Sequence, residues 1–160
     1  MTWRHAALAV GAIATLLAAV PVVAFGIVPL FVKSTLDEPP PAAQPTAPLP
    51  ASSSSPAAAS LLSGSLRRID AVHYGSGRVI LAGGFLRFED VDIAGAPNMF
   101  VYLSDRADGQ PGSYVDLGPL RATNGSFNYI LPLDVNVSSV RSVVVWCRAF
   151  SVTVTYAVLA

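Results

Sequence analysis

The sequence has a single cysteine, Cys147, and only two histidines in 160 residues. One cysteine cannot form an intramolecular disulfide, so the fold must be held together by its hydrophobic core. A structural zinc site takes about four cysteine, histidine or carboxylate ligands, and this chain has too few soft ligands to supply them. The composition therefore excludes a disulfide-stapled fold and a fold built around structural zinc.

Charged residues are also scarce. They make up 12% of the chain, and ten basic residues balance ten acidic ones. Without an excess of positive charge there is no basic surface to attract the phosphates of nucleic acid. Nucleic acid is therefore not an expected partner of this protein.

Charge is absent altogether from residues 6–32. A helix needs about 20 apolar residues to span a bilayer, whereas the apolar region of a cleavable signal has only about 7–15. We therefore predict one retained transmembrane helix, within a signal-anchor segment of residues 1–33. Arg4 precedes the run and Asp37 follows it, which favours a cytoplasmic N-terminus and a single-pass protein of the cell membrane with an extracytoplasmic C-terminal domain. The alternative is a signal peptide cleaved near Ala24, which would also deliver the domain outside the cytoplasm.

Residues 34–60 are rich in proline, alanine and serine and include Pro39–Pro41 and the run Ser52–Ser55. Such a composition cannot bury a core and favours a semi-extended chain. We predict a flexible tether that lets the following domain stand off the membrane by up to on the order of 80 Å.

Residues 61–160 contain short apolar runs rich in valine, isoleucine, phenylalanine and tyrosine, separated by turn-forming residues. This texture predicts an all-β domain, and the number and spacing of the runs favour an antiparallel β-sandwich or a partly open barrel. Asn124-Gly125 is the strongest hairpin-turn signal. The expected strands are 64–73, 78–82, 85–89, 99–104, 114–120, 127–131, 142–147 and 151–158.

The last two of these strands differ in pattern. Residues 151–156 alternate strictly, which predicts that the valine and tyrosine side chains face the core and the hydroxyls face water. Residues 143–147 do not alternate, which indicates a central strand covered on both faces. Cys147 lies in that central strand and is expected to be shielded. From the residues alone, a shielded lone cysteine is more typical of an inert core residue than of a reactive thiol.

His73 is the only histidine of residues 61–160, and Asp70 and Ser76 lie near it in the chain. The surrounding Gly75-Ser76-Gly77 lacks the pattern of a nucleophile elbow, so a Ser-His-Asp hydrolase is not indicated. The residues by themselves do not indicate a hydrolase or a transferase, and they leave open whether the protein is an enzyme.

The segment from Val143 to Ala157 resembles the closing motif of the DM-thirteen domain family, and the pair Trp146-Cys147 followed by Phe150 is its most specific part. Further matches occur upstream in the family's order. They are His73 with Gly75-Ser76-Gly77, Leu86–Asp90, Pro97 with Val101–Ser104, Asp116–Leu120, and Gly125–Tyr129 with Pro132. The resemblance covers about residues 61–159.

This resemblance implies a β-rich extracytoplasmic domain of a kind often found beside DOMON domains. The family's cysteine is proposed to act in electron transfer, either as a bare thiol or as a ligand to a prosthetic group such as haem. Cys147 is then the candidate redox residue, His73 and Met99 are the other candidate haem ligands in the domain, and a redox partner protein is expected. The alternative is a non-enzymatic extracytoplasmic binding or adhesion β-sandwich in which Cys147 only packs in the core.

Overall fold

The computed structural model describes residues 33–41 and 61–160, which belong to one compact unit. These residues form nine strands and one short 3-10 helix, η3 (Val137–Ser139). The strands are β1 (Thr35–Asp37), β2 (Leu62–Ser65), β3 (Gly75–Ala82), β4 (Phe85–Ile93), β5 (Met99–Ser104), β6 (Tyr114–Pro119), β7 (Asn124–Ile130), β8 (Ser142–Cys147) and β9 (Val152–Val158).

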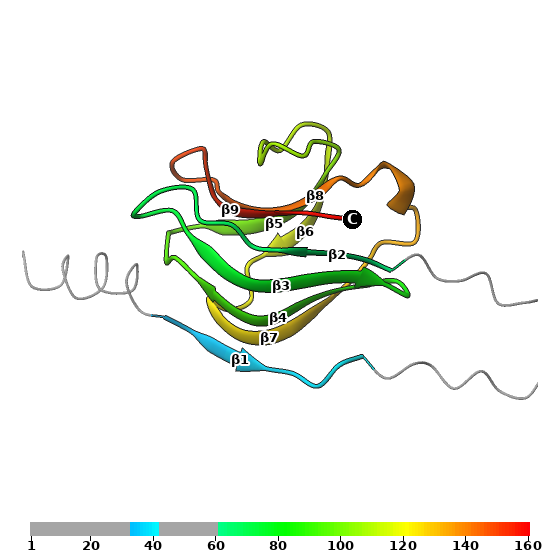
Figure 1. Cartoon of the computed structure of the whole chain (residues 1–160), viewed down its shortest axis with the longest axis horizontal. Coiled ribbons are helices and arrows are strands. Elements are labelled where there is room, and N and C mark those ends of the chain that lie inside the picture. Colours follow the sequence, from blue (N-terminus) through cyan, green and yellow to red (C-terminus); the bar gives the residue numbers. More distant parts are fainter. Residues whose placement is uncertain (1–32, 42–60) are drawn as a thin grey trace, which may run out of the picture. The chain divides into compact units, whose positions relative to one another are not determined.

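The strands form two sheets (Figure 1). A five-stranded sheet has the order β1-β7-β4-β3-β2, and a four-stranded sheet has the order β6-β5-β8-β9. Every pair is antiparallel except β1 and β7, which are parallel. Apolar side chains of both sheets share one core, in which the rings of Phe88 and Phe127 stack with centroids 5.0 Å apart. The prediction of an all-β, sandwich-like domain is confirmed.

The two sheets are joined along one side. Ser63 of β2 and Ala160, which follows β9, exchange two backbone hydrogen bonds of 3.0 Å. A little further on, the Arg67 amide donates to the carbonyl of Tyr156 in β9, also at 3.0 Å. On the other side, β1 and β6 remain the edges of their sheets. The domain is thus a sandwich whose two sheets are joined along one side.

No helix in residues 33–41 or 61–160 is long and apolar enough to cross a membrane. The apolar run of residues 6–32, on which the predicted transmembrane helix rests, lies outside the described residues. The membrane anchor therefore stays a prediction, as does the alternative of a cleaved signal peptide.

The prediction that a flexible tether begins at Ser34 is wrong for its first residues. Residues 35–37 form β1, which pairs with the start of β7, and Leu36 packs against the core. The carbonyl of Ser34 accepts hydrogen bonds from the backbone amides of Thr123 (3.1 Å) and Asn124 (2.9 Å). The rest of the expected tether, residues 42–60, lies outside the described part of the chain. Those residues lie between β1 and β2 in the chain, and the prediction that they are flexible stays a prediction.

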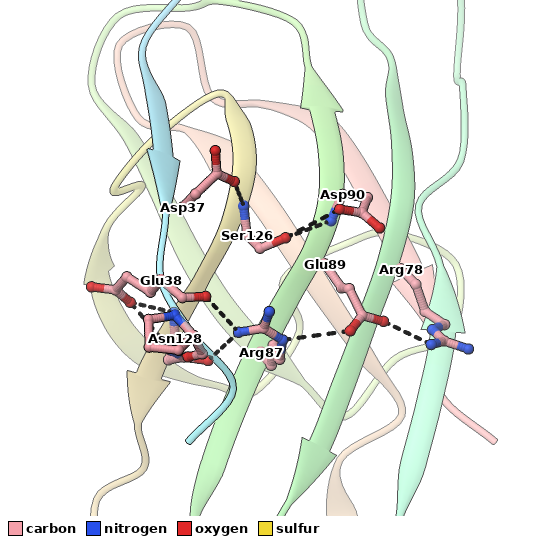
Figure 2. Close-up of polar contacts among 9 residues, drawn as sticks. Asp37, Glu38, Arg78, Arg87, Glu89, Asp90, Ser126 and Asn128 are labelled. Atoms are coloured by element: carbon pink, nitrogen blue, oxygen red, sulfur yellow. Dashed lines mark hydrogen bonds and ion pairs between the residues drawn. The ribbon is translucent and has the colours of Figure 1, made fainter. Parts of the chain in front are cut away.

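Polar side chains fix the end of β1 to the five-stranded sheet (Figure 2). The Glu38 carboxylate accepts two hydrogen bonds from Arg121, at 2.8 and 2.6 Å, and a third from the Asn128 amide at 2.9 Å. From β4, Arg87 donates to the Glu38 carbonyl at 3.2 Å and to the Asn128 side chain at 3.0 Å. The hydrogen bond from Arg121 is the main reason why the pKa of Glu38 is lowered. β1 is therefore held both by its backbone ladder and by charge-assisted contacts.

Two further predictions, the strand at 64–73 and the hairpin turn at Asn124-Gly125, are wrong. The strand expected at 64–73 ends at Ser65, and the segment that follows turns towards β9, leaving Val72 68% exposed. Asn124-Gly125 is not a hairpin turn but the start of β7, where Gly125 has a φ of +101° beside a register shift. A bulge and a tight hairpin both use positive φ, so the same dipeptide suits either. A Cβ at Gly125 would lie 2.3 Å from the Leu36 carbonyl oxygen, so glycine also allows β1 to approach.

Gly77 lies at a bulge in β3, and we expect Gly77→Ala to lower the melting temperature strongly. Its φ is +94°, and a Cβ would lie 2.5 Å from the carbonyl oxygen of Asp90. Positive φ and a backbone clash together should cost about 3 kcal/mol of unfolding free energy. Gly84 is a matched control, because its φ is +81° but nothing lies within 4 Å of its Cβ position. Gly84→Ala should cost only about 1 kcal/mol. Equal decreases in melting temperature for the two variants would show that the clash at Gly77 does not contribute to the loss of stability.

Candidate functional site

Cys147 is the last residue of β8 and belongs to the hydrophobic core with Val143 and Val145. Its relative exposure is 0%, so the prediction that it is shielded is confirmed. The thiol donates a hydrogen bond to the carbonyl oxygen of Pro97, 3.1 Å away in the β4–β5 connection. The sulfur is therefore both enclosed and oriented.

The structure brings Met99 to Cys147 but places His73 elsewhere. Met99 of β5 is the direct cross-strand partner of Cys147, so the two sulfur-containing side chains lie on the same face of the four-stranded sheet. His73 precedes β3 in the segment that runs along β9, and its Nδ1 lies 2.7 Å from Asp70 Oδ2. Chain spacing alone did not indicate that Met99 and Cys147 are neighbours; the antiparallel register of β5 and β8 decides it.

A cavity of about 700 Å³, which we call the outer cavity, lies beside His73. Its lining includes Trp146 of β8, Tyr156 of β9, Arg67 and His73 from the segment after β2, and Gln110 from the β5–β6 loop. Successive side chains of a strand point to opposite faces, so Trp146 faces away from the core that holds its neighbour Cys147. The cavity therefore lies on the outer face of the four-stranded sheet.

The β5–β6 loop forms one wall of this cavity, and Figure 1 shows it folded beyond β5 and β8. Thr153 of β9 donates a hydrogen bond to the Gly109 carbonyl at 2.6 Å, and Ser104 donates to the Gln110 carbonyl at 2.9 Å. Gly109 has a φ of +82°, and a Cβ there would lie 2.7 Å from the Tyr156 ring. The wall thus rests directly on an aromatic side chain that belongs to the sheet.

Tyr156 was expected to face the core, and that expectation is wrong. The β8–β9 register shifts after Val145, because Val145 pairs with Thr155 whereas Trp146 pairs with Thr153. The extra residue, Val154, reverses the alternation. Thr155 is consequently fully buried, with its hydroxyl donating to the Arg67 carbonyl at 2.8 Å, and Tyr156 lines the outer cavity. A bulge of this kind is set by pairing with a neighbouring strand and leaves no signal in a regularly alternating segment.

The three candidate ligands do not fit a haem group. A porphyrin needs open space beside the ligand atom, but the Cys147 sulfur is enclosed by the core and hydrogen-bonded to Pro97. Cys147 and Met99 line none of the three described cavities, whereas His73 lines the outer cavity on the opposite face of the sheet. Within residues 33–41 and 61–160, no group of three or more histidine, cysteine or carboxylate side chains is placed to hold a metal ion.

Asp70 organises the turn that carries His73, while Ser76 lies at a different cavity. The Asp70 carboxylate accepts hydrogen bonds from the His73 ring and from the amides of Val72 and His73, and these bonds, the ring first, lower the pKa of Asp70 to about 2. Because the lowered pKa favours the carboxylate in the folded state, the stabilisation is present above the ordinary pKa of 3.8 and is lost as pH falls through about 2.

We therefore expect the amide signals of Val72 and His73 to titrate in acid with a midpoint near pH 2, the lowered pKa of Asp70. NMR titration of the folded protein measures this midpoint directly. Asp70→Asn should abolish the titration of both amides. A midpoint at pH 3.8 would mean that the Asp70–His73 contact does not persist in solution.

Comparison with known protein families gives one assignment. The family model described as Electron transfer DM13 matches residues 69–159, which include every strand from β3 to β9 and all three candidate residues. No curated protein matches the chain, and no solved structure does. The family match covers more than half of the 160 residues and agrees with the resemblance seen in the sequence. The chain therefore belongs to the electron-transfer DM-thirteen family.

Proposed function

We propose that this protein is a membrane-anchored extracytoplasmic electron-transfer module in which Cys147 is the redox residue. The observation that carries the proposal is the family match across residues 69–159, which contains the only cysteine of the chain. Among core side chains, a thiol is the group with the richest redox chemistry. Pro97 holds this thiol in one orientation through the 3.1 Å hydrogen bond.

Burial limits how Cys147 can exchange electrons. Thiol–disulfide exchange requires a partner sulfur to reach the thiolate in contact, and the Cys147 sulfur is closed to solvent in the folded state. Electron transfer does not need such contact. Trp146 is the adjacent residue and presents its indole ring to the outer cavity, so it offers a short route between a partner at the surface and the sulfur in the core.

Voltammetry of the full chain in detergent, adsorbed on an electrode, tests the proposal. We expect a redox signal that Cys147→Ser abolishes and that Trp146→Leu slows without removing. An absorption spectrum and metal analysis of the same samples should show no haem band that depends on Cys147, because the Cys147 sulfur is enclosed by the core and His73 lies on the other face of the sheet. A signal that persists unchanged in Cys147→Ser would place the redox centre elsewhere.

The anchor is proposed from the uncharged run of residues 6–32. Such a run is held by the hydrophobic effect, which washing with salt or alkali does not weaken. We expect the full chain to remain in the membrane fraction through both washes. Recovery of a soluble form that begins after Ala24 would instead show a cleaved signal peptide.

A second function, a binding module, is favoured by the outer cavity itself. The cavity combines aromatic, cationic and hydrogen-bonding side chains, as small-molecule sites do. On this alternative Cys147 only packs in the core. Voltammetry without a signal, together with ligand binding at the cavity, would favour the binding module over electron transfer.

A further inference from the structure

We infer that the outer cavity is a binding site for a small planar aromatic anion. Its volume of about 700 Å³ is within the range of about 300–1,000 Å³ typical of small-molecule sites. Trp146 and Tyr156 are both half-buried in its lining. A half-buried indole such as that of Trp146 can hold a planar aromatic group by stacking, whereas the Tyr156 ring already lies beneath the Arg67 guanidinium and against the β5–β6 loop. The cavity therefore has the volume and an aromatic surface for a ring system.

The carboxylates at the cavity already have partners. Asp70 is bonded to His73, with Nδ1 and Oδ2 2.7 Å apart. Asp108, from the β5–β6 loop, accepts a hydrogen bond from Arg106 Nε at 3.0 Å and a second from the same guanidinium. Both carboxylates are therefore occupied by hydrogen-bond donors of the protein, and Arg106 also offsets the negative charge of Asp108.

Unlike the two carboxylates, the two arginines of the lining lie over aromatic rings. In the described part of the chain, neither Arg67 nor Arg68 forms an ion pair with a carboxylate. The Arg67 guanidinium lies over the Tyr156 ring, 5.8 Å from its centroid, and Arg68 lies over Tyr74 at 4.8 Å. Cationic donors thus stand beside an aromatic surface while the nearby carboxylates are occupied, so the cavity complements negative charge.

This combination discriminates between ligand classes. A neutral ring would use the stacking surface but give the guanidinium groups no anionic partner, and a non-aromatic anion would use the guanidinium groups but not the aromatic surface. An aromatic sulfonate, carboxylate or phenolate uses both. The inference holds for either function proposed above, because none of the groups that carry it is Cys147.

Fluorescence of Trp146 tests the inference. In the full chain carrying Trp3→Phe, Trp146 is the only tryptophan. Titration of this protein in detergent with anthraquinone sulfonate should quench the fluorescence saturably. The comparison compounds are neutral hydroxymethyl anthraquinone and non-aromatic cyclohexane sulfonate. Each should bind about tenfold more weakly, because each lacks one of the two kinds of contact.

A pair of variants separates specific binding from general attraction of anions. Arg67→Gln should weaken binding of anthraquinone sulfonate about tenfold. Arg141→Gln is the matched control, because Arg141 is also exposed but does not line the cavity. This variant should bind anthraquinone sulfonate with unchanged affinity. Cys147→Ser should bind like the parent protein, so failure of the electron-transfer role would leave this result intact. Any of three results would overturn the inference. They are no saturable quenching, equal affinities for anthraquinone sulfonate and the neutral compound, and an equal loss of affinity for anthraquinone sulfonate in the two arginine variants.

Discussion

Cutting the chain once between residues 42 and 60 is expected to leave its two pieces bound to each other. The N-terminal piece contributes β1 to the five-stranded sheet, where residues 35–37 pair with residues 124–126 of β7. Leu36 packs against the core, and Glu38 forms the paired hydrogen bonds to Arg121. These contacts survive the cut because none of them depends on residues 42–60.

To test this, a specific protease site is inserted between Ser53 and Ser54 of the full chain in detergent, and the cut protein is analysed by gel filtration. The two pieces should elute together and separate only in denaturant. Glu38→Ala should make them separate more readily, because it removes the ion pair to Arg121. Asp108→Ala is the matched control, since Asp108 also forms an exposed ion pair, but with Arg106 inside the β5–β6 loop.

Acid should weaken the same association. The hydrogen bond from Arg121 lowers the pKa of Glu38 below its ordinary value of 4.5. The contribution of Glu38 is therefore present above pH 4.5 and is lost as the pH falls through the lowered pKa. Pieces that separate at neutral pH immediately after cleavage would show that β1 is dispensable. Such a result would restore the interpretation of residues 34–60 as a simple tether.

Labelling of Cys147 by a maleimide is expected to be slower in the folded protein than in denaturant by on the order of a thousandfold or more. The thiol has 0% exposure, so the reagent reaches it only after the structure opens locally or globally. As a control, Ala107→Cys in a Cys147→Ser background places a thiol on the exposed β5–β6 loop, and it should react at the rate of a free thiol. Rapid labelling of native Cys147 would instead indicate an accessible sulfur and favour exchange chemistry.

Substitutions at Cys147 separate its packing from its redox role. Cys147→Ala leaves a small cavity and removes the bond to Pro97, and it should cost about 2 kcal/mol of unfolding free energy. Cys147→Ser keeps a donor for the Pro97 carbonyl and should cost about 1 kcal/mol. Thermal unfolding measures both. Both variants should remain folded, so loss of the voltammetric signal would report on the sulfur itself. A signal retained in either folded variant would reduce Cys147 to a packing residue.

Local patterns in the sequence were sufficient for much of the fold. The bounds of β5 and β8 were predicted correctly, and the unbroken apolar run in β8 indicated that Cys147 is shielded. Both features depend on side-chain periodicity within one strand, which nearby residues alone set. The single cysteine and the family resemblance were equally visible in the chain, and together they identified Cys147 as the candidate redox residue.

Only the tertiary structure decided which residues meet. β1 has one apolar residue and pairs with a strand 89 residues away, so no local pattern marks it. The bulge at Val154 turns Tyr156 out of the core, and the segment after β2 brings Arg67 to it, which together create the outer cavity. Met99 reaches Cys147 through the register of β5 and β8, while His73 is carried to the other face of the sheet. Strand pairing depends on backbone hydrogen bonds between distant segments, and those bonds are nearly independent of the side chains that the sequence displays.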